Sequence, residues 1–171
     1  MLRNVEIKAK VRDLGDTVSK AKKLSNSEGT WIKQDDIFFR IPQGRGRLKL
    51  RTFEDRSAEL IFYDRPDSDG PKLSKYDKCS VPNGSQMSSV LSFALGVEGS
   101  VKKKRQLFMV GQTRVHIDYV EKLGNFMELE VVLSEDQTLD EGKLIAQSLM
   151  ADLGVRKEDL VSGTYMDLLL K

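Results

Sequence analysis

Apolar and polar residues alternate along most of this chain, which is the pattern of strands with one apolar and one polar face. In the first segment, Val5, Ile7 and Ala9 face one way, while Glu6 and Lys8 face the other. Similar alternation, together with β-branched and aromatic residues and with turn residues between the segments, predicts about eight strands. They are expected at residues 3–11, 31–41, 47–53, 59–65, 72–81, 101–110, 114–120 and 126–133.

Apolar residues at helical spacing predict three helices among these strands. Gly96 lies where the second helix would end, and Thr138 and Glu141 form a capping-box pattern at the start of the third. Strands linked mostly in hairpins, with few helices between them, predict an α+β fold whose antiparallel sheet curls or closes. The helices are expected at residues 13–24, 83–95 and 138–153, with a further short turn at 164–170.

The length and composition fit one domain that spans residues 1–171. A chain of 171 residues can bury a hydrophobic core, and no stretch rich in Pro, Gly or Ser divides it. Its 28 Lys and Arg residues nearly balance its 26 Asp and Glu residues, so composition does not call for nucleic acid or a membrane surface as partner. We expect neither partner, and a monomer or homodimer.

The N-terminus has no apolar signal segment, and no uncharged apolar run approaches the ~20 residues that span a bilayer. A cytoplasmic protein is therefore expected. The single cysteine, Cys79, excludes an internal disulfide and cysteine-based zinc clusters, and the single histidine, His116, argues against a His-rich metal site. Oxygen ligands remain as the plausible metal chemistry.

Several predicted strands place charged residues of both signs on one face and apolar residues on the other. One interpretation is an ordinary sheet whose charged face meets solvent. The other is a closed barrel whose charged faces converge inside, with acids, bases and a bound ligand compensating one another. The charged faces are Arg47, Lys49 and Arg51; Lys103 and Arg105; His116 and Asp118; and Glu128 and Glu130.

The charged residues themselves suggest a ligand for such an interior. Asp and Glu without a surplus of His or Cys suit Mg²⁺ or Mn²⁺, which prefer oxygen ligands. Lys and Arg suit a polyphosphate, because guanidinium groups grip phosphate oxygens through a fork and ammonium groups act as point charges. The candidate phosphate-binding residues are Lys8, Lys49, Arg51, Arg65, Lys72, Lys103 and Arg105.

Short motifs in a fixed order strengthen this hypothesis. The segment from Asn4 to Lys8 corresponds to a Glu-x-Glu-x-Lys signature with Asn in place of the first Glu, and Lys-x-Arg ends at Arg105. A Leu-Gly-x-Phe-x-Glu-x-Glu stretch ends at Glu130, with Asp118 between the two. In these motifs the chain resembles the CYTH superfamily, the triphosphate tunnel metalloenzymes that include class IV adenylyl cyclases and thiamine triphosphatases. The segment from residue 65 to residue 76 looks closest to the class IV cyclase-like branch.

The resemblance implies a closed antiparallel barrel of eight strands with flanking helices, in which a tunnel binds a triphosphate and one or two Mg²⁺ or Mn²⁺ ions. It places Glu6, Asp118, Glu128 and Glu130 near the metal and the basic residues on the phosphates. Catalytic roles then fall to Glu6, Lys8 and Lys72.

Three functions remain open at this point. Metal-dependent hydrolysis of a triphosphate is favoured, because water demands less of the site than a precisely held ribose hydroxyl does. The alternative is a class IV-type adenylyl cyclase that converts ATP to cyclic AMP and pyrophosphate. Asn4 motivates a third possibility, a triphosphate-binding module without catalysis. His116 is assigned either proton transfer or a structural role, and Tyr165 either substrate contact or a place covering the barrel end.

Overall fold

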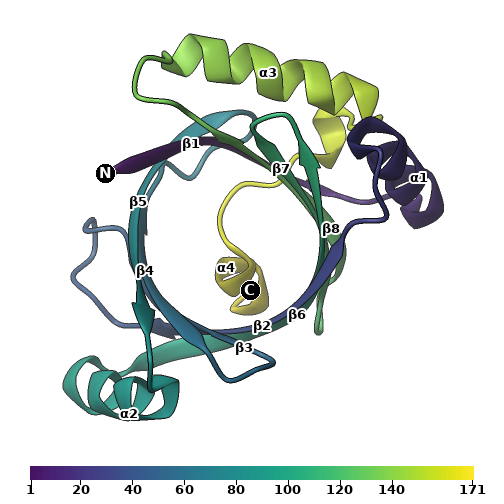
Figure 1. Ribbon diagram of the computed structural model, residues 1–171. Helices are drawn as coiled ribbons and strands as arrows, with labels where there is room; N and C mark the ends of the chain where they lie inside the picture. The colour runs from purple at the N-terminus through teal and green to yellow at the C-terminus, as the bar shows by residue number, and fades with distance from the viewer.

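Eight antiparallel strands close into a barrel in the computed structural model, which describes residues 1–171 (Figure 1). Around the barrel the order is β1-β5-β4-β3-β2-β6-β7-β8, and β1 closes the ring by pairing with both β5 and β8. The predicted α+β fold with a closed eight-stranded barrel is confirmed. The strands are β1 (Leu2–Lys10), β2 (Thr30–Phe39), β3 (Arg47–Phe53), β4 (Ala58–Asp64), β5 (Lys72–Val81), β6 (Val97–Val110), β7 (Thr113–Val120) and β8 (Gly124–Val132).

Three of the helices lie outside the barrel (Figure 1). The side chains of Asp13, Asn83 and Thr138 cap their first turns, and the predicted capping box of Thr138 and Glu141 is present. Helices α1 and α3 cover β6, β1 and β8, and α2 packs on β2 and β3. None of these helices combines the length and the apolar composition that a membrane-spanning helix requires. The helices are α1 (Leu14–Ser25), α2 (Gly84–Leu95), α3 (Leu139–Asp152) and α4 (Tyr165–Leu169), with a 3₁₀ turn at Lys157–Asp159.

The main hydrophobic core lies between the outer face of the barrel and the helices. Ile7, Phe108 and Leu129 are fully buried there against Ala21 of α1 and Leu149 of α3. Since side chains alternate along a strand, the charged residues beside these apolar ones point into the barrel. The interpretation of the charged faces as solvent-exposed surfaces is therefore wrong, because the apolar faces are the ones that the helices cover.

The start of β6 is the boundary that differs most from the prediction, and the other strand ends agree within two residues. Strand β6 begins at Val97, directly after Gly96, the C-cap residue of α2, and not at residue 101. Its first residues pair with the end of β2, where the register shifts between Phe38 and Phe39. A shift of this kind interrupts the alternation, so residues 97–100 lack the strand pattern that the rest of β6 shows.

The C-terminal segment lies inside the barrel. Helix α4 is seen within the ring of strands in Figure 1, and the chain reaches it from α3 across the barrel opening. Tyr165 and Met166 are buried there against Phe38, Val101 and Phe126. This second apolar cluster fills part of the barrel interior and leaves the remainder to charged side chains.

Candidate functional site

The barrel encloses a cavity of about 500 Å³ that is lined by residues from all eight strands and from the start of α4. Nearly all of the predicted site residues line it, because strand periodicity places residues i and i+2 on the same face. Lys72 and Asp118 are the predicted residues that do not line it. Those that do are Glu6, Lys8, Lys49, Arg51, Arg65, Lys103, Arg105, Glu128 and Glu130.

One wall of the cavity gathers three cations around a single carboxylate. Asp36 of β2 accepts two hydrogen bonds of 2.8 Å from Arg51, and its Oδ2 lies 3.2 Å from Lys49 Nζ and 3.3 Å from Lys103 Nζ. Only 1% of Asp36 is exposed. Burial alone would raise its pKa, but Arg51, Lys103 and Lys49 outweigh burial and hold the pKa well below its ordinary value.

Sequence reasoning assigned no role to Asp36. The alternation of β2 indicates only that Gln34, Asp36 and Phe38 share a face, whereas the pairing of Asp36 with Arg51 on β3 appears in the strand register. With a single carboxylate among three cations, this wall keeps a surplus of positive charge. It is therefore suited to a multiply charged anion.

Burial makes two of the lysines less basic than an ordinary lysine. Burial lowers the pKa of Lys49 to about 7, and the neighbouring Arg51 acts in the same direction. Burial likewise lowers the pKa of Lys8 to about 8, although the nearby Glu128 opposes this effect. An anion placed between these ammonium groups would favour their charged forms.

The carboxylates form a second region, on β1 and β8. Glu6 is the register partner of Glu130, and Lys8 is the register partner of Glu128. Glu6 accepts a hydrogen bond of 2.7 Å from Arg65. Glu128 lies farther from its cations, 3.8 Å from Lys8 Nζ and 4.0 Å from Arg105 Nη2.

Glu128 and Glu130 differ in ionisation. Burial would raise the pKa of Glu128, but Lys8 and Arg105 outweigh burial and hold it well below its ordinary value. Burial raises the pKa of Glu130 to about 7, and the negative charge of Glu6 adds to this effect. A cation bound near Glu130 would therefore stabilise its ionised form.

His116 lies next to this region, because it is the register partner of Glu128 on β7. Only 1% of it is exposed, and neither ring nitrogen has a hydrogen-bond partner. Burial lowers the pKa of His116 well below its ordinary value, with Arg105 acting in the same direction. The imidazole is therefore neutral, with one donor nitrogen and one acceptor nitrogen.

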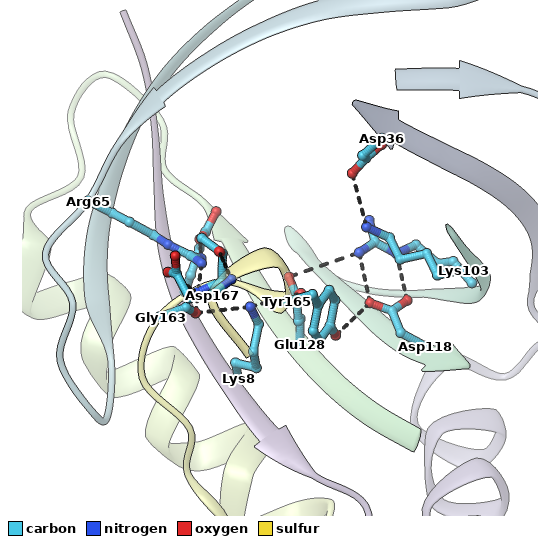
Figure 2. Close-up of polar contacts among 12 residues, drawn as sticks. Lys8, Asp36, Arg65, Lys103, Asp118, Glu128, Gly163, Tyr165 and Asp167 are labelled. Atoms are coloured by element: carbon cyan, nitrogen blue, oxygen red, sulfur yellow. Dashed lines mark hydrogen bonds and ion pairs between the residues drawn. The ribbon is translucent and has the colours of Figure 1, made fainter. Parts of the chain in front are cut away.

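Asp118 does not join the other predicted metal ligands. Its two oxygens accept hydrogen bonds of 2.8 and 2.9 Å from Arg105, and Oδ2 also accepts one of 2.8 Å from the Tyr165 hydroxyl (Figure 2). Its side chain is fully buried. In this structure Asp118 positions Arg105 and α4.

Lys72 is also engaged elsewhere. It is the register partner of Glu6, but its Nζ donates a hydrogen bond of 2.6 Å to the carbonyl of Ser68, in the loop before β5. Its position on the strand is the predicted one, while its ammonium group binds that loop and not a cavity residue.

The segment before α4 contacts several of the predicted phosphate-binding residues. The Gly163 carbonyl accepts hydrogen bonds of 3.1 Å from Lys8 and 3.2 Å from Arg65 (Figure 2). The ring centroid of Tyr165 lies 4.0 Å from Lys8 Nζ and 5.4 Å from Lys103 Nζ. Both lysines thus lie near the face of the aromatic ring, where a cation is stabilised.

The donor set of the cavity suits a hard divalent cation. No three side chains of the His, Cys, Asp and Glu type already converge closely enough to hold a metal ion. Glu6 and Glu130 nevertheless occupy directly facing positions, with Glu128 two residues from Glu130, and burial together with the negative charges of Glu6 and Glu128 raises the pKa of Glu130. Mg²⁺ and Mn²⁺ are usually held by a few carboxylates together with substrate phosphates, so these residues fit such an ion.

Comparison with known proteins gives a consistent result. The CYTH domain family matches residues 2–165. The protein named adenylate cyclase CyaB of Aeromonas hydrophila is 23% identical over 143 residues, which cover 80% of this chain and 72% of that protein.

Solved structures share the fold. The PH1012 protein of Pyrococcus horikoshii superposes with a TM-score of 0.84 at 22% identity, covering 96% of this chain and 98% of that one. HpAC1 of Hippeastrum, described as having a dominant triphosphatase activity, superposes with a TM-score of 0.60 at 17% identity, covering 89% and 88%.

Proposed function

This chain belongs to the CYTH domain family, and from that premise we propose that it hydrolyses a triphosphate in the barrel with the help of a divalent metal ion. The substrate is inorganic triphosphate or a nucleoside or other organic triphosphate. The observation that carries the proposal is the surplus of buried positive charge around Asp36, where Arg51, Lys49 and Lys103 share one carboxylate. A chain of phosphates supplies the missing negative charge.

The proposed residues divide between binding and chemistry. Lys49, Arg51, Lys103 and Arg105 bind phosphate oxygens from the β3 and β6 walls. A bound Mg²⁺ or Mn²⁺ would supply charge neutralisation at the phosphate oxygens. Glu6 accepts a hydrogen bond from the attacking water and orients it toward the terminal phosphorus.

Lys8 lies two residues from Glu6 on the same inner face of β1, and the two residues pair with Glu128 and Glu130 of β8. Its ammonium group offsets the negative charge that develops on the departing polyphosphate when the bond to the terminal phosphorus breaks. Lys72, opposite Glu6 on β5, contributes a second ammonium group when its side chain turns from Ser68 into the cavity.

A cyclase is the second candidate, and the A. hydrophila relative named adenylate cyclase is the observation that favours it. In that reaction the ribose 3′-hydroxyl attacks the α-phosphorus of ATP, and pyrophosphate leaves. Hydrolysis requires only a positioned water, whereas cyclisation also requires a tightly held ribose. We therefore prefer hydrolysis.

A substrate panel tests the proposal. With Mg²⁺ or Mn²⁺, we expect phosphate release from at least one of inorganic triphosphate, ATP and thiamine triphosphate, and complete loss of turnover in EDTA. Phosphate, pyrophosphate and cyclic AMP are quantified together. Cyclic AMP with pyrophosphate as the main products of ATP would replace the proposal with the cyclase. Tight triphosphate binding without turnover would favour a binding module that lost activity at Asn4.

Proton uptake on binding tests the role of the lysines. At pH 8 the pKa values of about 7 for Lys49 and about 8 for Lys8 leave both side chains partly neutral, and a bound polyphosphate favours their protonated forms. In EDTA, we expect the wild type to take up about one proton more than Lys49→Arg on binding inorganic triphosphate, because arginine is already charged.

The measurement is calorimetry in buffers that differ in ionisation enthalpy. At pH 6 the difference between the two proteins should be small, since Lys49 is then protonated before the anion binds. Equal proton uptake by both proteins at pH 8 would show that Lys49 does not contact the phosphates.

A further inference from the structure

Three side chains on β7 and β8 have weaker polar contacts than the other predicted site residues in the barrel. His116 has two buried nitrogens without a partner, and Glu128 and Glu130 have only ion pairs of 3.4 Å or longer. Every other predicted acidic site residue has short hydrogen bonds. Glu6 is 2.7 Å from Arg65, and Asp118 is held by Arg105 and Tyr165 at 2.8–2.9 Å.

The unpaired state of His116 is costly. A buried polar group without a partner destabilises the fold, and His116 is the one side chain here with two such atoms. The charged groups around it include the guanidinium groups of Arg105 and Arg114, which donate hydrogen bonds, and the carboxylate of Glu128, which accepts them, yet neither ring nitrogen is bonded to any of them. Because no donor bonds to it, the lone pair of the neutral imidazole is free to bind an electron-pair acceptor such as a metal ion.

The backbone register places the three groups together. His116 and Glu128 are direct partners on β7 and β8, and Glu130 follows two residues later on the same inner face. Directly opposed side chains of this kind have Cβ atoms ~4.5–5.5 Å apart, so small rotations bring their tips to one ion. Glu130 gives up its 3.4 Å contact with Arg114 in the process.

We propose that His116 is a ligand of the divalent metal ion, together with Glu128 and Glu130, and that Asp118 is not. The proposal rests on the metal-dependent function proposed above and names the side chains that hold the metal. An imidazole nitrogen suits Mn²⁺ better than Mg²⁺, which prefers oxygen donors. The site therefore binds Mn²⁺ more tightly than Mg²⁺.

The chain contains one histidine, which allows a direct test. Untagged protein is loaded with Mn²⁺, alone and with inorganic triphosphate, and electron spin-echo modulation is recorded. We expect modulation from a directly bound nitrogen, and we expect its frequency to change when only histidine is labelled with ¹⁵N. A fully occupied Mn²⁺ site without histidine modulation would overturn the proposal and leave the metal-dependent function intact. Absence of Mn²⁺ binding even with triphosphate would count against both.

A pair of variants gives a second measurement. His116→Leu removes the nitrogen, and Gln34→Leu is the matched control, because Gln34 is also buried on the cavity wall with an unpaired oxygen. We expect His116→Leu to lower Mn²⁺ affinity at least ~10-fold and Mg²⁺ affinity less, with no fall of Tm in EDTA. Gln34→Leu should leave Mn²⁺ affinity unchanged. Equal Mn²⁺ affinities for wild type and His116→Leu would refute the assignment.

Discussion

Glu130→Gln is expected to lower metal-dependent turnover of inorganic triphosphate by about 10²–10³-fold without lowering stability. The loss follows because the amide carries no charge to hold the metal. Removal of one group that stabilises a transition state electrostatically typically lowers the rate by about this factor. The fold should not suffer, because Glu130 is repelled by Glu6 and its pKa is raised to about 7 by burial and by that charge. Steady-state kinetics and thermal unfolding in EDTA measure the two effects.

The pH dependence of stability shows whether Glu130→Gln loses turnover because a metal-binding charge is removed or because the fold is destabilised. In the unfolded chain a glutamate ionises near pH 4.5, and in the fold Glu130 ionises near pH 7, so its ionisation destabilises the fold as pH rises between these values. Glu130→Gln removes that loss, and its Tm should fall less than that of the wild type over this range. Glu121→Gln, an exposed change after β7, is the control. Full turnover by Glu130→Gln would show that Glu130 does not hold the metal ion.

The architecture could be predicted because the alternation of apolar and polar residues within each segment indicates a strand. Most of the strands show apolar residues on one face and polar residues on the other, and hairpin connections pair most neighbours. The pattern did not decide which face was inside. That depends on how α1 and α3 cover the apolar face, and a single strand cannot report this packing.

The site could be predicted only as a set of inner-facing charges. Sequence periodicity correctly directed Lys49, Arg51 and Lys103 into the cavity. It did not reveal their partner Asp36, nor the pairing of Asp118 with Arg105 and Tyr165, because these contacts depend on register and on a distant segment. The bond from Lys8 to Gly163 joins residues 155 positions apart, and nothing local in either segment indicates it.

Because the barrel interior is charged, the stability of the fold depends on pairing of buried charges of opposite sign. Removal of one charged side chain leaves its partners buried without a counter-charge, which lowers the free energy of unfolding. The effect is largest where one group neutralises several. Asp36 is such a group, with three cations within 3.3 Å.

Asp36→Asn is accordingly expected to destabilise the metal-free and ligand-free protein by ~3–5 kcal/mol at pH 7, the usual cost of breaking a buried charge pair. The nearby cations hold the pKa of Asp36 well below its ordinary value, so the stabilisation is present above about pH 4 and is lost as pH falls further. The deficit of Asp36→Asn relative to the wild type should therefore shrink in acid. Urea unfolding at several pH values measures it.

Asp35→Asn provides the matched control, because Asp35 is the next residue on β2 but points outward and has no ion pair in the structure. It should change stability by no more than ~0.5 kcal/mol. Inorganic triphosphate should raise the Tm of Asp36→Asn more than that of the wild type, because the phosphates replace the missing negative charge beside Arg51, Lys49 and Lys103. An equal Tm rise in both proteins would show that the anion binds away from this wall, and with it the assignment of these three residues to phosphate would fail.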